Sequence, residues 1–223
     1  MAGLIVFARY PRPGEVKTRL GASIGHEAAA AAYRSMAAHA FAVAEEVAMG
    51  GVTVYLSYAP GAGEDEVRSW VGREFHFLVQ EGEDLGGRMY HAFRHLFSSQ
   101  SGPAVIIGTD VPALTAEIVQ TAFAHLQTHD LVIGPSRDGG YYLLGMRSLH
   151  PRLFLEINWG SPTVLQKTME RAAELGLRSV HLEALDDIDT SEDYAAYLRL
   201  RSGGSRTPDS HPSTPHDPPI TGG

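Results

Sequence analysis

Residues 131–142 read LVIGPSRDGGYY, an apolar run that passes straight into a carboxylate, two glycines and two tyrosines. A short, continuous apolar run of this kind is typical of a strand that is buried on both faces of a sheet. Asp138 therefore stands just beyond the end of a strand, where open α/β sheets carry their substrate sites. Gly139 and Gly140 lack a Cβ, so the backbone there allows the close approach of a ligand.

Two further acidic segments follow strand-like runs. Asp110 follows the apolar run AVIIG at 104–108, and the segment DDID at 186–189 follows a weaker run at 179–182. Each segment taken singly indicates ordinary turn chemistry. Converging at one sheet edge, together with a basic loop after the first strand, they predict a divalent-cation site for phosphates.

The alternation of strands and helices predicts one α/β domain over residues 1–201. Strands are expected at 4–8, 52–58, 75–79, 104–108, 131–134, 141–145 and 179–182, and helices at 26–49, 64–71, 86–97, 115–127, 161–175 and 190–200, with N-caps at Thr115, Ser161 and Thr190. Helical segments between strands indicate crossover connections and a mainly parallel sheet, into which the strand at Tyr141 inserts antiparallel. Residues 202–223 are rich in Gly, Ser, Pro and Thr, so we expect a disordered tail.

Composition excludes several classes of function. The chain has 223 residues, a formal net charge of -8 and no cysteine, so it lacks the Lys/Arg-rich face of a nucleic-acid binder and forms no disulfide. The apolar run at 4–7 is too short for a signal sequence, and we expect no membrane span. These features predict a cytoplasmic protein whose phosphate ligand is small and held locally.

The connection after the first strand carries the positive charges that a phosphate needs. It reads RYPRPGEVKTRL at 9–20, where Gly14 gives backbone freedom and Arg12, Lys17 and Arg19 could bind the phosphates of a nucleotide. The loop has neither the Gly-Lys-Ser/Thr of a P-loop nor the three glycines of a dinucleotide fingerprint. A solvated basic loop is the alternative, because exposed Arg and Lys are common. Its position at the same edge as the acidic loops favours the phosphate site.

Five motifs resemble, in order, those of a known bacterial family. They are FARYPRPGEVKTRL at 7–20, DLGGRM at 84–89, GTDVP at 108–112, GPSRDGGYY at 134–142 and DIDT at 187–190. The family is a glycosyltransferase-like group of the nucleotide-diphospho-sugar transferase superfamily, named the radical-SAM/selenodomain-associated transferase family. The motif order is also similar to that of the molybdenum cofactor guanylyltransferases and the phospholactate guanylyltransferases. The resemblance covers about residues 3–200 and implies a GT-A-like, Rossmann-like domain with three α/β/α layers.

The resemblance implies a nucleotide-binding role for the basic residues. Arg12, Lys17 and Arg19 would meet the nucleotide phosphates, with Gly14 in the same loop. Arg88, in the second motif, has two alternative roles, an ion pair at the surface or a contact with the substrate.

The resemblance also implies a metal site. Asp110 would be a ligand for Mg²⁺ or Mn²⁺, and Asp189 a second one. Metal-dependent GT-A glycosyltransferases usually show Asp-X-Asp at this strand end, whereas the chain has Thr109-Asp110-Val111. The single Asp followed by Pro112 resembles a nucleotidyltransferase instead.

These residues predict a metal-dependent transferase with a nucleotide-activated donor and a small-molecule acceptor. The first hypothesis is a glycosyltransferase acting from a nucleotide sugar. The alternatives are nucleotidyl transfer from a nucleoside triphosphate to a small phosphorylated acceptor, and a non-catalytic nucleotide-binding module. Asp110 would act with the metal, and Asp138 as a general base or acceptor anchor. Gly139, Gly140 and Trp159 would lie on the acceptor side, with Trp159 either a stacking platform or a hydrophobic staple.

Other polar groups have simpler interpretations. His91 and His95 stand at i and i+4 of a helix, but no third ligand lies near in sequence to complete a zinc site. Asp84 precedes the same helix, where a carboxylate is expected for electrostatic reasons alone. We interpret Asp186 and Asp187 as part of a solvated acidic loop.

Overall fold

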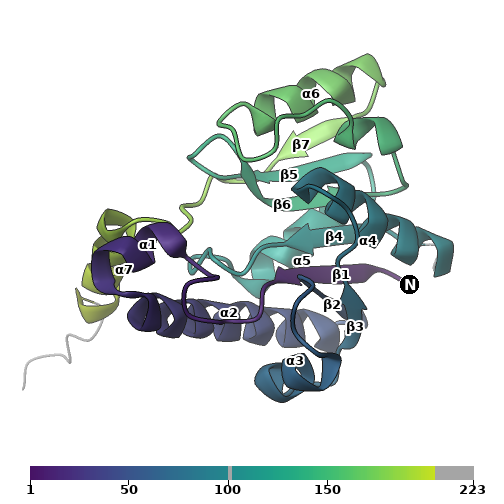
Figure 1. The fold of residues 1–223 in the computed structure, drawn as a ribbon. Coiled ribbons are helices and arrows are strands. Elements are labelled where there is room, and N and C mark those ends of the chain that lie inside the picture. The colour runs from purple at the N-terminus through teal and green to yellow at the C-terminus, as the bar shows by residue number, and fades with distance from the viewer. Residues whose placement is uncertain (100–101, 204–223) are drawn as a thin grey trace, which may run out of the picture.

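The computed structural model describes residues 1–99 and 102–203. These residues form a seven-stranded sheet with the strand order β3-β2-β1-β4-β6-β5-β7 (Figure 1). β6 is antiparallel to its neighbours β4 and β5, and the other strands run in one direction. This confirms the mainly parallel sheet with an antiparallel strand at Tyr141. The strands are β1 (Gly3–Ala8), β2 (Thr53–Tyr58), β3 (His76–Val79), β4 (Ala104–Ile107), β5 (Leu131–Pro135), β6 (Tyr141–Met146) and β7 (Ser179–His181).

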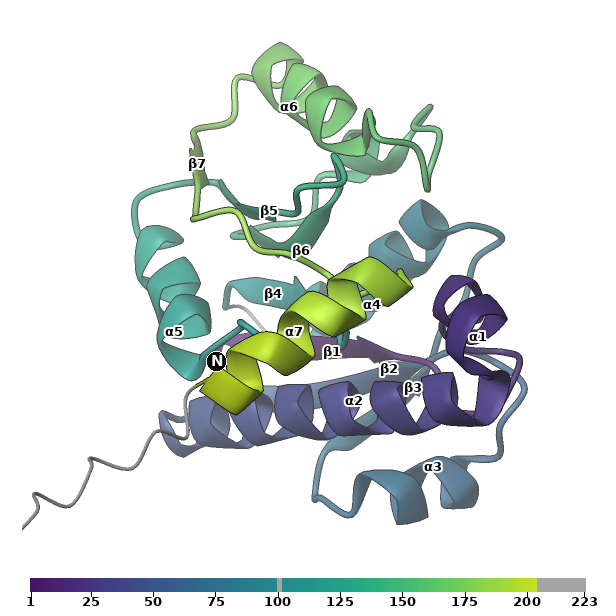
Figure 2. The ribbon, with the colours of Figure 1, turned by 90° about the vertical axis from the view of Figure 1, so that its left-hand side faces the viewer.

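Helices cover both faces of the sheet and complete the three predicted layers. One face carries α2 (His26–Met49), α3 (Glu64–Val71) and α5 (Ala116–His125), and the other carries α4 (Leu85–Ser99), the short 3-10 helix η1 (Pro151–Phe154) and α6 (Val164–Glu174). Figure 2 shows α2 and α6 on opposite sides of the sheet. Two further helices, α1 (Thr18–Ile24) and α7 (Ser191–Gly203), pack against each other, and α1 also packs on α2. Within the described residues, none of the helices is long and apolar enough to cross a membrane.

The central strands are continuously apolar because both faces of the sheet are covered. In β1, Leu4 and Val6 pack with α2, whereas Ile5 between them packs with α4 on the opposite face. The parallel register places Leu4 beside Val105 and Ile5 beside Ile106 of β4. The three β1 side chains are fully buried, and each such burial contributes roughly 1.5–3 kcal/mol. The buried strands therefore fix the positions at which the loops at their carboxyl ends begin.

The structure differs from the prediction at two helix starts. The connection at residues 9–20, in which no helix is expected, ends at Lys17, because α1 begins at the next residue. Leu20 is fully buried, so tertiary packing stabilises a helix that would be too short to form alone. Ser161 does not cap α6, which begins at Val164. The Ser161 hydroxyl instead bonds to Thr163 Oγ1 at 2.8 Å.

The other two predicted N-caps are confirmed. Thr115 Oγ1 accepts a hydrogen bond from the Ile118 N–H at 3.3 Å. At the start of α7, Thr190 Oγ1 accepts from the Asp193 N–H at 3.2 Å, and Asp193 Oδ2 accepts from the Thr190 N–H at 2.8 Å. This is the reciprocal arrangement of a capping box. α7 continues through residue 203, two residues into the predicted tail, and the rest of that tail lies outside the described residues.

Candidate functional site

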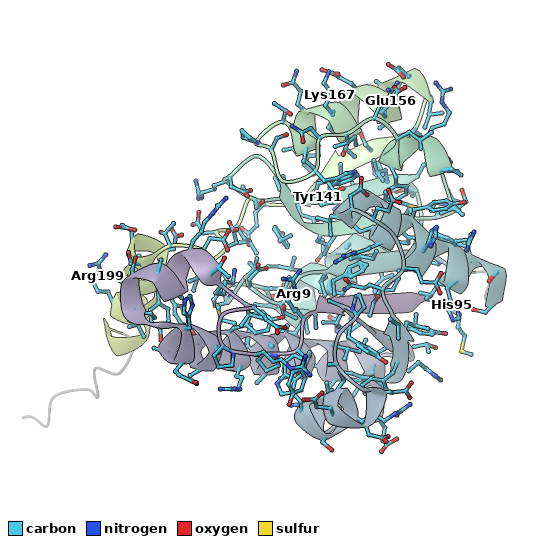
Figure 3. The ribbon with its side chains drawn as sticks, viewed as in Figure 1. Arg9, His95, Tyr141, Glu156, Lys167 and Arg199 are labelled. Atoms are coloured by element: carbon cyan, nitrogen blue, oxygen red, sulfur yellow. The ribbon has the colours of Figure 1, made fainter. Side chains whose placement is uncertain are left out.

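A cleft of about 560 Å³ opens at the carboxyl ends of the parallel strands. The loops after β1, β4, β5 and β7 line it, together with the first turns of α4. Figure 3 places the lining residues Arg9 and Tyr141 near the middle of the molecule, with Arg9 on the side of α2 and Tyr141 on the side of α6. The cleft therefore lies where open α/β sheets carry their substrate sites.

Lys17 lies at the charged end of this cleft. Its Nζ donates to Asp110 Oδ2 at 2.9 Å and to Asp189 Oδ1 at 2.6 Å. The Lys17 side chain is 6% exposed, whereas those of Asp110 and Asp189 are 38% and 40% exposed. Burial alone would lower the pKa of Lys17, but the charges of Asp110 and Asp189 outweigh it and hold that pKa above its usual value. The group is thus a charged ammonium held between two carboxylates from distant loops.

Backbone and core contacts bring the loops after β4 and β7 together. The Ile188 N–H donates to the Asp110 carbonyl at 3.0 Å, and the Ile188 side chain is buried in the core. With Ile188 turned inward, the flanking Asp187 and Asp189 both line the cleft. Because Thr190 provides the cap of α7, the Asp189 carboxylate is not used to cap that helix, and it faces the cleft, where Oδ1 accepts from Lys17 Nζ and Oδ2 lies 3.9 Å from Arg19 Nη1.

A buried tyrosine ties the basic loop to the loop that carries Asp110. The Tyr33 hydroxyl, from α2, accepts a hydrogen bond from the Arg9 N–H at 3.0 Å and bonds to Thr109 Oγ1 at 2.9 Å. Burial raises the pKa of Tyr33, so the hydroxyl keeps its proton. Because Thr109 directly precedes Asp110, the beginnings of the two loops are held at a fixed spacing.

The β5–β6 hairpin brings Asp138 to the cleft beside the loop after β7, where the Leu185 N–H donates to the Pro135 carbonyl at 3.1 Å. One oxygen, Oδ1, accepts from Ser136 Oγ at 2.5 Å and from the Gly140 N–H at 2.9 Å, which closes the turn. The other oxygen, Oδ2, has no hydrogen-bond partner in the part of the chain that the structure describes. Asp138 is exposed and lines the cleft, so one carboxylate oxygen is committed to the turn and one is left for a ligand.

Asp187 belongs to the cleft as well, so the prediction that it lies in a solvated loop is wrong. The side chain is half-buried. Desolvation, and then the negative charges of Asp138, Asp189 and Asp110, raise the pKa of Asp187 to about 6. Asp186 is exposed as predicted. The sequence could not separate the two, because only the burial of their neighbour turns one of them toward the cleft.

The basic side chains between β1 and the first turn of α1 lie in two places. Arg19 lines the cleft with a side chain that is 78% exposed. Arg9 lines the cleft too, although its type alone did not distinguish it in the sequence. Arg12 turns away and donates to Glu66 of α3 at 3.0 Å. Both Arg12 and Gly14 line a neighbouring groove of about 400 Å³ instead of the main cleft.

The first turn of α4 carries Arg88 and provides the surface on which Trp159 packs. Arg88 lines the cleft and has no ion-pair partner within the described ranges. Asp84 lies at the start of the helix, as expected, and its Oδ1 also accepts from the Gly87 N–H at 2.7 Å, which caps the helix. The Trp159 indole packs so closely over Gly86 that a Cβ there would lie 2.2 Å from the ring. Trp159 is therefore a cleft wall that is fixed by its packing.

The two glycines of the hairpin have different surroundings. Gly140 lines the cleft. Gly139 has a φ of +92°, and a Cβ there would lie 2.0 Å from the Pro162 carbonyl oxygen. The Gly139 carbonyl also accepts from the Leu165 N–H at 2.9 Å. The close backbone approach at Gly139 is thus made by the segment that leads into α6.

The histidine pair of α4 lies outside the cleft. His91 Nδ1 is 3.4 Å from Glu81 Oε2, and His95 packs edge-on against Tyr55. Among residues 1–99 and 102–203, no three His, Asp or Glu side chains are grouped so that they could hold a metal ion.

Asp110 and Asp189 could still bind a divalent cation whose remaining ligands are substrate phosphates and water. Both carboxylates meet at one point, the Lys17 ammonium. Mg²⁺ is commonly held by one or two carboxylates together with substrate phosphates and water. The two hard oxygen donors therefore fit a Mg²⁺ or Mn²⁺ ion that arrives with a phosphate.

Three solved structures illustrate the proteins that share this fold. A putative nucleotide-diphospho-sugar transferase from Desulfovibrio desulfuricans G20 is 35% identical with a TM-score of 0.85, over 92% of this chain and 89% of that one. A nucleotidyl transferase from Methanothermobacter is 17% identical with a TM-score of 0.60, over 91% and 97% of the two chains. The 4-diphosphocytidyl-2C-methyl-D-erythritol synthase from Anaerococcus prevotii DSM 20548 is 13% identical with a TM-score of 0.58, over 89% and 98%. The fold is that of the nucleotide-diphospho-sugar transferases and nucleotidyltransferases, and the two likenesses of low identity show the fold alone.

The chain belongs to the bacterial family described as "Uncharacterized protein conserved in bacteria (DUF2064)", which its residues 42–161 match. The matched segment contains Arg88, Asp110 and Asp138 and leaves Lys17 and Asp189 outside. No curated protein matches the chain.

Proposed function

We propose that the chain is a glycosyltransferase that takes a sugar from a nucleotide diphosphate and passes it to a small-molecule acceptor. The observation that carries this proposal is the convergence of Lys17, Asp110 and Asp189 in the cleft that Asp138 also lines. The likeness to the Desulfovibrio desulfuricans protein supports it. The motif at residues 7–20 supports the radical-SAM/selenodomain-associated type within this proposal.

The donor diphosphate would bind at the charged end of the cleft. Arg9, Arg19 and Arg88 line the cleft with Lys17, and guanidinium and ammonium groups both bind phosphate oxygens strongly. Asp110 and Asp189 would hold Mg²⁺ or Mn²⁺, which neutralises the charge of the diphosphate as it leaves. The chain as a whole is acidic, so these cations attract phosphate locally.

The acceptor would bind against the β5–β6 hairpin. Asp138 Oδ1 is fixed by its two turn hydrogen bonds, which orients Oδ2 for an acceptor hydroxyl. As a general base, Oδ2 would take the hydroxyl proton while the acceptor oxygen bonds to the sugar carbon and the bond to phosphate breaks. Tyr141 and Trp159 line the cleft as well and offer aromatic faces for a sugar or acceptor.

Nucleotidyl transfer to a small phosphorylated acceptor is the second candidate. The observation that favours it is the loop after β4, in which Asp110 stands between Thr109 and Val111 without a second carboxylate. Asp110 is bonded to Lys17 and lines the cleft. The Asp110 side chain therefore does not cap a helix. A capping role for Asp110 would have favoured a non-catalytic nucleotide-binding module.

Phosphorus NMR of a turnover mixture tests the proposal and separates the two reactions. A thermal-shift screen of nucleotides and nucleotide sugars, with Mg²⁺ or Mn²⁺, first selects the donor, because a ligand at 100 times its Kd stabilises the protein by about 2.7 kcal/mol. With the selected donor and a panel of sugars, phosphosugars and phosphoacids, glycosyl transfer releases a nucleoside diphosphate. Release of pyrophosphate from a triphosphate would establish the second candidate instead. Tight nucleotide binding without turnover of any donor would contradict both.

Two carboxylate variants test the roles assigned to Asp110 and Asp138. Asp110→Asn keeps the size and removes the charge, so nucleotide binding should lose its dependence on Mn²⁺ and turnover should nearly vanish. Asp138→Asn should keep metal-dependent donor binding and lose turnover by about a hundredfold or more if it is the general base. Titration calorimetry with and without Mn²⁺ measures the first effect, and a rate assay the second. The opposite pattern would show that the two roles are reversed.

A further inference from the structure

Lys17 occupies the point at which the two proposed metal ligands meet. Its Nζ contacts Asp110 Oδ2 and Asp189 Oδ1 at 2.9 Å and 2.6 Å. With a side chain only 6% exposed, the ammonium is poorly screened by water. A divalent cation that used the same two carboxylates would stand next to this like charge, which opposes its binding.

The geometry of Lys17 allows the ammonium to leave without unfolding the site. The backbone of Lys17 is fixed at the start of α1, in the left-handed region at φ 45° and ψ 49°. Its charge sits at the end of a flexible four-carbon stem. Lys17 lines the cleft together with Arg9, Arg19 and Arg88, so a phosphate bound by those side chains would lie within the same space.

We propose that Lys17 is a built-in cation that occupies the carboxylate pair in the free protein, so that a divalent cation binds there only with a phosphate ligand that draws Lys17 away. The inference rests on the proposed function, because it assumes a phosphate-bearing donor. It makes metal binding and phosphate binding mutually supportive. By thermodynamic linkage, each must strengthen the other by the same factor.

The first test titrates Mn²⁺ alone into the nucleotide-free protein, with the bound fraction measured by electron paramagnetic resonance. Lys17→Met should bind Mn²⁺ about tenfold or more tightly than the wild type, because the competing charge is gone. The chain contains only one other lysine, Lys167, which pairs with Glu170 on α6 at 2.7 Å and lies at the periphery in Figure 3. Lys167→Met is therefore the matched control and should bind Mn²⁺ like the wild type.

A double variant locates the new affinity. Lys17→Met combined with Asp110→Asn should lose the gain in Mn²⁺ binding, because the ion would then have only one of the two carboxylates. Circular dichroism of each variant before titration shows whether it is folded. If the double variant kept the full gain, the ion would be binding elsewhere and the inference would be overturned.

The second test observes Lys17 directly and does not depend on removing it. In Lys167→Met, the remaining lysine side-chain signal in ¹⁵N-lysine NMR belongs to Lys17. Pyrophosphate added to this metal-free protein should shift that signal, because the ammonium exchanges carboxylate partners for phosphate. An unshifted signal at saturating pyrophosphate would overturn the inference.

The outcomes separate this inference from the proposed function. Equal Mn²⁺ affinity in the wild type and Lys17→Met would refute the lysine role even if sugar transfer were demonstrated. Tighter Mn²⁺ binding in Lys17→Met, with a pyrophosphate-dependent Lys17 signal, would establish that role even if no nucleotide sugar or triphosphate were turned over.

Discussion

Removing the Tyr33 hydroxyl should loosen the basic loop from the acidic loop without changing any charge. That hydroxyl accepts from the Arg9 N–H at 3.0 Å and pairs with Thr109 Oγ1 at 2.9 Å. Tyr33 and Thr109 are each 5% exposed, so water does not readily replace the lost partner. A buried donor or acceptor left unsatisfied costs about 1–3 kcal/mol. Because a phenylalanine ring keeps the stacking on Trp70, we expect Tyr33→Phe to lower the free energy of unfolding by about 2 kcal/mol.

A double-mutant cycle with Thr109→Val isolates the bond between the two side chains. Thr109→Val removes only that bond and leaves the Arg9 N–H paired, so it should cost less than Tyr33→Phe, about 1 kcal/mol. The double variant should lose less than the sum of the single losses, by about 0.5–1.5 kcal/mol. Urea denaturation followed by circular dichroism measures all four proteins.

The same variants test whether the fixed spacing matters for phosphate binding. Tyr33→Phe should weaken pyrophosphate binding measured by calorimetry well below the unfolding transition, because Arg9 then starts from a less defined position. Thr109→Val should weaken it less, since the Arg9 N–H keeps its acceptor. Strictly additive stability losses, or Tyr33→Phe within about 0.5 kcal/mol of the wild type, would refute this reasoning.

Two further predictions concern the cleft walls. Because the pKa of Asp187 is raised to about 6, the folded state holds that proton more tightly than the unfolded state, and stability falls as the pH rises from about 4 to about 6. Asp187→Asn should therefore raise the free energy of unfolding by about 1–2 kcal/mol at pH 7, after a discount for partial exposure, with no gain near pH 4 and little change in the control Asp186→Asn. Gly86→Ala should destabilise by about 1–3 kcal/mol, because its Cβ would overlap the Trp159 ring. Gly87→Ala, whose Cβ would meet its nearest atom at 3.4 Å, should be neutral or stabilising when both variants are compared by thermal melting, and a Gly86→Ala variant as stable as Gly87→Ala would show that the ring moves aside.

The layers and the strand directions could be predicted from the sequence because they depend on local patterns. The run at 131–134 is apolar throughout, as a strand covered on both faces requires. The cap of α7 is formed by Thr190 and Asp193, which are near neighbours in the sequence. α1 could not be predicted, because its stability comes from the burial of Leu20 and not from its own propensity. The start of α6 was misplaced because Ser161 bonds to a neighbouring hydroxyl and not to a helix N–H.

The candidate site could be predicted where a residue's place at a strand end fixes its position. Asp110 and Asp138 follow strands of the same sheet, so their arrival in one cleft follows from topology. Three positions depend on the tertiary packing of the chain. Arg12 is drawn aside by Glu66 of α3, Asp187 is turned inward by its buried neighbour, and Tyr33 bonds to loops that lie 24 and 76 residues away. No local pattern encodes those contacts.

The chemistry of position 17 favours lysine over arginine for a group that must hold two carboxylates and then release them. A guanidinium binds a carboxylate through a planar, bidentate fork, which suits one partner in one orientation. The Lys17 ammonium instead reaches Asp110 and Asp189 from a single atom, at 2.9 Å and 2.6 Å. Its three hydrogens are arranged around that atom, so it can exchange a carboxylate oxygen for a phosphate oxygen by a small swing of the stem. In the proposed complex, Arg9 of the same loop and Arg19 of the first turn of α1 would hold the phosphate in place. The loop thus combines two kinds of cation, and the difference between them allows one charge to move while the others stay.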